Sequence, residues 1–312
     1  MQIVYLDAFS SHPQELNLSA LEQLGALKMY DRSTREEILD RAKDAEIVLT
    51  NKAVLDGQIM SQLPKLKYIG VTATGYNVVD IQAAKDRGIV VTNAKNYSSM
   101  SVAQHVFALI LTFTNRIKEH DSIEKWTQSP DFTYYEYSLS ELAGKTIGLV
   151  GIGDIGEKVA QVAAAFEMKV LVNRKSEMQH PKYETVSLDE LLARADILSL
   201  HAPLTDENKG FMNLESFKKM KPSSLLINTG RGPLVDEKDL RQALDSGLIA
   251  GAALDVLSNE PPTENNPLIG AKNLVISPHV AWATLEARQR LMDIVAQNIE
   301  AWQSGEPVNV VN

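Results

Sequence analysis

The sequence predicts an α/β protein with two doubly wound domains, each built on a parallel sheet. Two observations predict this class. Short β-branched runs alternate with helical patterns along the chain, which is typical of parallel sheets covered by helices on both faces. In addition, residues 145–175 follow the order strand, glycine turn, helix, strand, which is the arrangement of a dinucleotide-binding unit. A chain of 312 residues, 44% of them hydrophobic, is long enough for two separate cores.

The first third of the chain predicts one of the two sheets. Strand patterns lie at residues 3–6, 27–30, 46–50, 66–71 and 89–92, and helical patterns lie at 15–24 and 34–43. Open parallel sheets bind ligands at the carboxyl ends of their strands. Two segments, 50–52 and 72–76, lie where strands end, so we expect both at that edge. Asn51 and Lys52 suit a hydroxylated substrate, with a plain turn role as the alternative.

The middle of the chain predicts a helix and then an aromatic loop. Residues 101–114 are apolar almost all round, which predicts a buried helix leading into the second domain. Residues 120–139 read as a polar loop that carries Trp126, Phe132, Tyr134, Tyr135 and Tyr137. So much aromatic surface favours a contact between subunits. Local packing of the loop is the alternative.

The glycine turn is the strongest motif in the sequence. A strand pattern at 146–150 leads into Gly151, Gly153 and Gly156, and a helix to residue 165 and a strand at 168–172 follow. The first glycine permits a tight turn, the second lets the backbone approach a pyrophosphate, and the third lets the helix pack closely on the strand. Asp154 and Ile155 begin the helix, whose free N–H groups suit phosphate.

The rest of the chain completes the second domain. Strand patterns lie at 197–201, 224–228, 250–255 and 274–277, with helical patterns at 188–194, 214–220 and 237–245, which predicts six or seven strands. The final helix, 284–303, is long enough to return to the first domain. We therefore predict a substrate-binding domain of residues 1–98 plus 285–312, and a dinucleotide-binding domain of residues 99–284.

Composition narrows the class of protein. The net charge of −9 and the pI near 5.3 argue against a nucleic-acid or membrane surface. The absence of cysteine excludes disulfides and thiolate chemistry, and we predict no metal site. The first residues have no basic segment of the kind that precedes a secretory core, and no apolar run is long enough to cross a bilayer. We expect a cytoplasmic protein.

Three charged residues follow strands of the second domain: Arg231, Glu260 and His279. An arginine fork binds a carboxylate or carbonyl, and a glutamate can fix one nitrogen of a histidine so that the other acts as an acid. The alternative for each residue alone is structural: Arg231 as a turn residue, Glu260 as a loop end and His279 as a strand cap. Together, downstream of a dinucleotide loop, they predict an active site.

The residues after the second strand of the glycine unit bear on the cofactor. A site selective for NAD places Asp or Glu there to bind the ribose 2′-hydroxyl, whereas this chain has Asn173, Arg174 and Lys175. Asn does not repel a 2′-phosphate, and the two cations can pair with it. We therefore favour NADP over NAD. The alternative is that both cations are solvated surface charges.

The chain resembles the D-isomer-specific 2-hydroxyacid dehydrogenase family. The segments that carry the resemblance are VGIGDIG at 150–156, NTGRGPLVDEKDL at 228–240, LDVLSNEPP at 254–262 and SPHVAWAT at 277–284. The resemblance implies two Rossmann-like domains with the active site in the cleft between them, a nicotinamide cofactor and a homodimer. It also places the catalytic set of the family on Arg231, Glu260 and His279.

The resemblance implies further site residues. The backbone loop that binds the substrate carboxylate falls on Ala73, Thr74 and Gly75, together with Arg231. The rest of the cofactor site falls on His201, Ala202, Pro203, Thr229, Arg231, Asp255 and His279, with Asp255 as acceptor of the nicotinamide amide. The segments 73–80, 101–109 and 278–284 are most similar to the glycerate dehydrogenase, or hydroxypyruvate reductase, branch.

The expected activity is therefore reduction of hydroxypyruvate to D-glycerate, and of glyoxylate as a further substrate, by hydride transfer. Reduction of another small 2-keto acid such as pyruvate is the alternative within enzymes. A phosphorylated substrate is disfavoured, because no basic cluster accompanies the carboxylate loop. A binding protein that senses the nicotinamide without catalysis is the alternative from another class.

Overall fold

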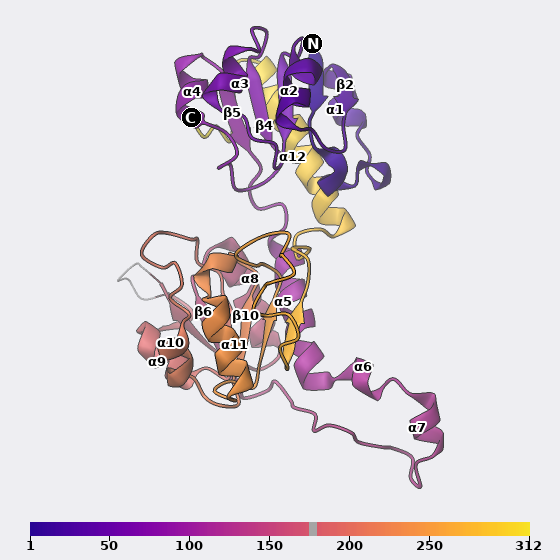
Figure 1. The fold of residues 1–312 in the computed structure, drawn as a ribbon, viewed down its shortest axis with the longest axis vertical. Helices are drawn as coiled ribbons and strands as arrows, with labels where there is room; N and C mark the ends of the chain where they lie inside the picture. The colour runs from indigo at the N-terminus through magenta and orange to yellow at the C-terminus, as the bar shows by residue number, and fades with distance from the viewer. Residues whose placement is uncertain (175–179) are drawn as a thin grey trace. The chain divides into compact units, whose positions relative to one another are not determined.

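The computed structural model describes residues 1–174 and 180–312 and divides into two compact units (Figure 1). The first comprises Met1–Ser98 and Trp282–Asn312, and the second comprises Ser99–Ala281. The first unit therefore resumes at Trp282, slightly before the expected residue 285. Both units are layered α/β structures with parallel sheets, which confirms the predicted fold class.

The first unit contains a parallel sheet of five described strands in the order β2-β1-β3-β4-β5. The strands are β1 Gln2–Tyr5, β2 Ala26–Met29, β3 Ile47–Thr50, β4 Tyr68–Val71 and β5 Val90–Asn93. The helices are α1 Ser19–Leu24, α2 Arg35–Ala42, α3 Gly57–Ser61, α4 Ile81–Asp86 and α12 Leu285–Gln303. One face of the sheet is covered by α2, α3 and α4, and the other by α1 and α12 (Figure 1).

Helix α12 brings the C-terminal part of the chain back into the first unit. Thr284 caps the helix by accepting a hydrogen bond from the N–H of Ala287. The buried side chains Leu291, Val295 and Ile299 then pack with Ile3 and other residues under the sheet. Spacing of four residues places these three side chains on one helix face, which is the pattern that the sequence shows.

The second unit contains a seven-stranded parallel sheet in its described part, in the order β12-β11-β10-β9-β6-β7-β8. The strands are β6 Thr146–Val150, β7 Lys169–Asn173, β8 Glu184–Thr185, β9 Ile197–Leu200, β10 Leu225–Asn228, β11 Gly251–Leu254 and β12 Leu274–Ile276. The helices are α5 Ser99–Asn115, α6 Ile117–His120, α7 Ile123–Thr127, α8 Asp154–Ala165, α9 Leu188–Arg194, α10 Leu214–Lys219 and α11 Glu237–Asp245. One face carries α5 and α8, and the other carries α9, α10 and α11. The strand order reverses between β6 and β9, which is where such sheets bind ligands.

Several predicted elements differ from the structure. The helix expected at 15–24 begins only at Ser19, because Pro13–Glu15 forms a 3-10 turn and Leu16 is extended. Helices α3 and α4 were not predicted, and both are short and begin at an aspartate cap, Asp56 and Asp80. The two-residue strand β8 was too short to predict.

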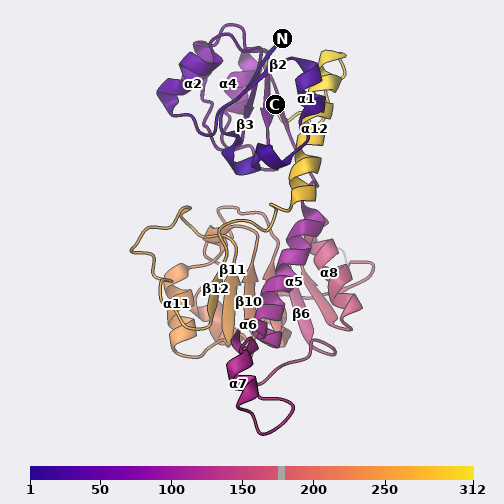
Figure 2. The same cartoon turned by 90° about the vertical axis from the view of Figure 1, so that its right-hand side faces the viewer.

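The segment expected as a loop at 120–139 contains helical turns. Helix α6 ends at His120, and α7 begins after Ser122, whose hydroxyl accepts a hydrogen bond from the N–H of Lys125. The segment extends away from the sheet of the second unit in both views (Figures 1 and 2). We call residues 116–139 the arm.

Candidate active site

The glycine turn has the geometry of a phosphate-binding loop. Gly151 has a φ of +90°, and a Cβ there would lie 2.7 Å from the nitrogen of Ala202, so only glycine fits. A Cβ on Gly156 would lie 2.7 Å from the carbonyl oxygen of Gly151. Gly153 precedes α8, and no atom lies within 4 Å of its Cβ position. The loop is therefore closely packed at Gly151 and Gly156 and open at Gly153. Exposed Asp154 and half-buried Ile155 then begin α8.

The neighbouring strand supplies the segment His201-Ala202-Pro203. The N–H of His201 donates to the carbonyl of Val150 at 2.8 Å, which fixes the segment beside the glycine turn. The Nε2 atom of His201 lies 2.9 Å from the hydroxyl of Ser199. Burial lowers the pKa of His201 to about 4, so the ring is neutral at physiological pH. Pro203 is exposed, and its carbonyl accepts from the amide of Asn208 at 2.8 Å.

One buried polar atom at this edge has no partner in the described chain. The Oγ1 atom of Thr229, directly after β10, is buried and makes no hydrogen bond within residues 1–174 and 180–312. Buried hydroxyls are nearly always satisfied, so an unsatisfied one at the same sheet edge as the glycine turn fits a bound ligand. Together with the glycine turn, Thr229 fits a nicotinamide dinucleotide.

Asn173 ends β7 and takes part in the sheet. Its carbonyl accepts from the N–H of Gly151 at 2.8 Å, and its Nδ2 donates to the carbonyl of Val186 at 3.1 Å. Arg174 follows as a half-buried residue. Lys175, the third residue of the predicted cofactor-selecting set, lies outside the described residues.

Arg231 lies on a turn that is fixed from both sides. The side chain of Asn228 donates to the carbonyl of Arg231 at 2.9 Å and accepts from the N–H of Gly230 at 3.0 Å. A Cβ on Gly232 would lie 2.0 Å from the carbonyl carbon of Leu257, so the turn packs directly on the backbone of the segment that leads to Glu260. The guanidinium of Arg231 is exposed and donates to the carbonyl of Gly230 at 2.8 Å.

Glu260 and His279 form a direct pair. The Nδ1 atom of His279 lies 2.7 Å from Oε2 of Glu260. The other carboxylate oxygen, Oε1, accepts from the N–H of Leu257 at 2.9 Å, which orients the carboxylate. Both side chains are about one-third exposed, at 36% for His279 and 34% for Glu260. The backbone of His279 is left-handed, with a φ of +54°, which is uncommon outside glycine and often marks a functional site.

Asp255 anchors the segment that carries His279. Its carboxylate is buried and accepts hydrogen bonds from the hydroxyl of Ser277 at 2.6 Å and from the N–H groups of Val280 and Ala281, both at 2.9 Å. Burial alone would raise the pKa of Asp255, but these hydrogen bonds and the imidazole of His105, 3.5 Å away, hold it below its usual value. Asp255 is therefore an ionised anchor for residues 277–281.

The first unit carries the predicted carboxylate loop, Ala73-Thr74-Gly75. The side chain of Asn93 donates to the carbonyl of Thr74 at 2.7 Å, and the hydroxyl of Thr74 donates to the carbonyl of Ala94 at 3.1 Å. The loop is thus tied to the end of β5. Oδ1 of Asn93 is buried and has no partner within the described ranges.

In the first unit, the strand order reverses between β1 and β3, and the side chain of Asp7 lies at this point. The carboxylate of Asp7 accepts from the backbone N–H groups of Asn51, Lys52 and Ala53 at 2.5–2.8 Å. These are the donors that would otherwise bind an anion. The side chain of Asn51 is buried and donates to the carbonyl of Thr72 at 2.7 Å, which favours the turn role, whereas the side chain of Lys52 is exposed.

Sequence reasoning missed the residues that hold these groups in place: Asp7, Asn93, His105, Asn228, Gly232 and Ser277. His105 is one that a closer look could have found, because it is an ionisable residue in an otherwise apolar helix. Within the residues described, no cluster of three or more His, Cys, Asp or Glu side chains could hold a metal ion. None of the described helices is long and apolar enough to cross a membrane.

Comparison with known proteins identifies the family. Residues 107–281 match the model described as the NAD binding domain of D-isomer specific 2-hydroxyacid dehydrogenases. The whole chain is 43% identical to all of the hydroxypyruvate reductase of Blautia hydrogenotrophica. The chain belongs to the D-isomer specific 2-hydroxyacid dehydrogenase family. The resemblance seen in the sequence is therefore confirmed, as is the nicotinamide dinucleotide as cofactor.

Two further comparisons show that proteins with this fold act on more than one substrate. The chain is 43% identical to the glycerate dehydrogenase of Methylorubrum extorquens over 91% of each chain. A solved structure of an acyclic imino acid reductase, in complex with NADPH and D-Arg, matches all of both chains at 33% identity with a TM-score of 0.86. Members of the same fold thus act on different substrates, and the site must be argued from its residues.

Proposed function

We propose that this dehydrogenase is a hydroxypyruvate reductase, which reduces hydroxypyruvate to D-glycerate and accepts glyoxylate as a further substrate. The observation that carries the proposal is the 2.7 Å pair of His279 and Glu260 at the same sheet edge as the glycine turn. The 43% identity to a hydroxypyruvate reductase over the whole chain supports the choice of substrate. A relative named glyoxylate reductase, from Thermofilum pendens, is 42% identical to the chain and supports glyoxylate, the smaller keto acid, as the alternative substrate.

His279 is the proposed acid of the reaction. A bound reduced nicotinamide supplies the hydride for the 2-keto carbon, and the oxygen of that carbon then needs a proton. Because Nδ1 of His279 is hydrogen-bonded to Glu260, we assign the proton for the substrate oxygen to Nε2 of His279. The carboxylate of Glu260 stabilises the doubly protonated ring, and Leu257 keeps that carboxylate turned toward His279.

Arg231 is the proposed ligand of the substrate's carboxylate and keto oxygen. Its guanidinium is exposed on a turn that Asn228 and Gly232 hold rigid. The backbone therefore does not have to be ordered when the guanidinium binds the substrate. We assign the N–H groups of Thr74 and Gly75 to the substrate carboxylate as well. Asn93 supports that loop through its bond to the carbonyl of Thr74.

The proposed cofactor site uses the glycine turn for the pyrophosphate, and Thr229, His201, Ala202 and Pro203 around the rest of the dinucleotide. We propose Asp255 as acceptor of the nicotinamide amide, because its Oδ2 accepts from the N–H of Ala281 at 2.9 Å and a carboxylate oxygen can accept a second hydrogen bond. We propose NADP as the preferred form, since Asn173 is neutral and Arg174 is cationic.

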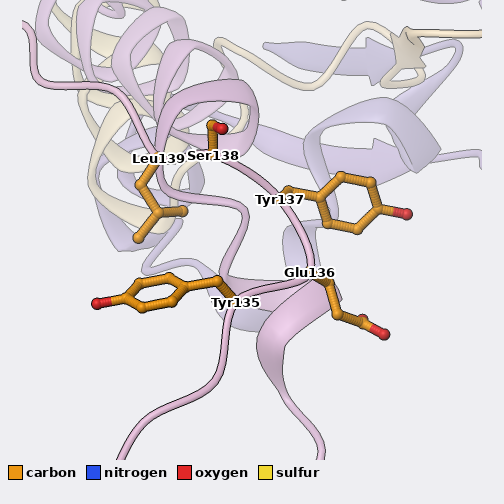
Figure 3. Close-up of a pocket in the computed structure, with 5 residues that line it drawn as sticks. All are labelled: Tyr135, Glu136, Tyr137, Ser138 and Leu139. Atoms are coloured by element: carbon orange, nitrogen blue, oxygen red, sulfur yellow. The ribbon is translucent and has the colours of Figure 1, made fainter.

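A homodimer built on the arm is proposed as the assembly. Four arm side chains are largely exposed: Ile117, Ile123, Phe132 and Tyr135, at 73%, 66%, 84% and 74%. The rings of Tyr135 and Tyr137 point to opposite sides of the chain (Figure 3). Tyr134 differs, because its hydroxyl donates to the carbonyl of His120 at 2.6 Å within the arm. An arm that is ordered by its own hydrogen bonds, yet leaves apolar side chains exposed, suits a second copy.

The test of the dimer is the mass in solution. Phe132→Ser combined with Tyr135→Ser should convert a dimer into a monomer in light scattering after size exclusion. Val54→Ser, at an exposed position of the first unit, is the control and should leave the mass unchanged. A monomeric unmodified protein would contradict the assembly.

The test of the activity is the initial rate of NADPH and NADH oxidation with hydroxypyruvate, glyoxylate and pyruvate in parallel. We expect the highest kcat/KM with hydroxypyruvate. A preference for glyoxylate or pyruvate would contradict hydroxypyruvate as the substrate but would leave the proposed mechanism unchanged. Tight cofactor binding without turnover on any of the three would favour the sensing protein.

A further inference from the structure

Helix α5 contributes an ionisable residue to the anchor of the His279 segment. Nε2 of His105 lies 2.9 Å from Oγ of Ser277 and 3.5 Å from Oδ1 of Asp255. The side chain of His105 is 24% exposed, and that of Asp255 is 1% exposed. The mechanism described above makes no use of His105.

The directions of these hydrogen bonds follow from their chemistry. An ionised Asp255 only accepts, so the single hydroxyl proton of Ser277 points to Oδ1, at 2.6 Å. The oxygen of Ser277 then accepts from Nε2–H of His105. The result is a directed chain from His105 through Ser277 to Asp255, which fixes the rotamer of Ser277 and the tautomer of His105.

This chain ends at the backbone of the proposed acid. Asp255 accepts from the N–H groups of Val280 and Ala281 with its side chain, and from the N–H of His279 with its carbonyl, at 2.8 Å. Helix α5 contacts the same segment a second time, because the hydroxyl of Ser101 donates to the carbonyl of Ala281 at 2.6 Å. His279 lies between these anchors with a left-handed backbone, which persists only where its surroundings impose it.

We propose that His105 is a positioning residue for the reduction. Through Ser277 and Asp255 it holds the left-handed turn at His279, so that the imidazole keeps the orientation from which it protonates the substrate. This inference rests on the proposed function of His279. It assigns His105 no contact with the substrate or the cofactor.

A pair of substitutions at residue 105 tests the proposal. His105→Leu removes the donor, whereas the amide nitrogen of His105→Gln replaces Nε2–H. We expect His105→Leu to lower kcat about 10-fold with KM within twofold, and His105→Gln to restore most of kcat. The kinetic isotope effect with cofactor deuterated at the transferred position should rise in His105→Leu, because the chemical step slows. Loss of folded protein would lower kcat without changing the isotope effect.

Two further variants complete the experiment. Gln104→Leu, at an exposed position of the same helix, is the control and should match the unmodified protein. Ser277→Ala breaks the chain at its middle and should resemble His105→Leu, so the test holds even where one variant does not fold. Amide hydrogen exchange of residues 280 and 281 should become faster in both variants, independently of activity.

The outcomes separate this inference from the proposed function. An unchanged kcat and isotope effect in His105→Leu, or equal losses in His105→Leu and His105→Gln, would overturn the role of His105 alone. His279→Gln, measured alongside, should be nearly inactive. If it is fully active, or if the unmodified protein reduces none of the keto acids, the proposed function fails and the role of His105 fails with it.

Discussion

Nδ1 of His279 lies 2.7 Å from Oε2 of Glu260, and the two residues come from different loops at one edge of the second sheet. Each loop is anchored by the backbone or side chain of a neighbouring segment: Glu260 by Leu257, and His279 by Asp255. The pair is therefore preorganised before any substrate binds. A base or acid that is already oriented contributes more to the rate than one that must be ordered during the reaction.

Removal of the imidazole should abolish turnover and leave cofactor binding in place. We expect His279→Gln to lower kcat about 10²–10⁴-fold, which is the usual contribution of a general acid. The dissociation constant for the reduced cofactor, from fluorescence titration, should stay within about twofold of the unmodified value, because the glycine turn is intact. Unchanged turnover would refute the assignment of His279.

Glu260→Gln tests the second half of the pair. The amide keeps an oxygen for the N–H of Leu257 but carries no charge to stabilise a doubly protonated His279. We expect kcat to fall about 10–100-fold, less than in His279→Gln, with KM for the keto acid nearly unchanged. A loss as large as that of His279→Gln would instead indicate that Glu260 contacts the reacting atoms.

Two glycines of the site should respond in opposite ways to alanine. A methyl group on Gly153 meets no atom within 4 Å, so Gly153→Ala should leave the Tm of the apoprotein within about 1 °C. It should weaken cofactor binding about 10-fold, because the methyl group would occupy the proposed phosphate position. A methyl group on Gly232 would collide with the backbone of Leu257. Gly232→Ala should therefore lower the free energy of unfolding by about 1–3 kcal/mol. Thermal unfolding and fluorescence titration of both variants check the contrast.

Stability should depend on pH through His201. Its pKa of about 4 in the folded protein is lower than the ordinary histidine value of 6.5, so below pH 6.5 the unfolded chain binds a proton that the folded chain does not. The stability is thus complete above pH 6.5 and decreases as the pH falls toward 4. Between pH 7 and pH 5 the loss from this one group is about 2 kcal/mol.

The matched variant for this prediction is His201→Gln, whose amide can still reach the hydroxyl of Ser199 but does not titrate. The difference in Tm between pH 7 and pH 5 should be clearly smaller in His201→Gln than in the unmodified protein. Equal differences would show that other groups determine the acid sensitivity.

The fold could be predicted from the sequence because its signals are local. Strand runs such as residues 197–200 and the glycine spacing at 151–156 specify their elements with little help from tertiary contacts. Short helices such as α3 could not be predicted, since five residues give no readable period and depend on the Asp56 cap. The residues of the site also divide into those with a local sequence signal and those without one. Arg231, Glu260 and His279 follow strands and were visible, whereas His105 and Asn93 act through partners far along the chain, 172 and 19 residues away.

Cofactor choice gives the last prediction. Asp at position 173 would repel a 2′-phosphate and accept from a ribose 2′-hydroxyl, so Asn173→Asp should raise the ratio of kcat/KM for NADH to that for NADPH at least about 10-fold. Asn173 also donates to the carbonyl of Val186, and a carboxylate cannot replace that bond, so a loss of about 1 kcal/mol in stability should accompany the change. Asn173→Ser, which keeps a donor and adds no charge, is the control for that loss and should leave the ratio nearly unchanged. If the unmodified protein already binds NADH more tightly than NADPH, the neutral Asn173 and cationic Arg174 do not select the phosphate, and the preference for NADP is wrong.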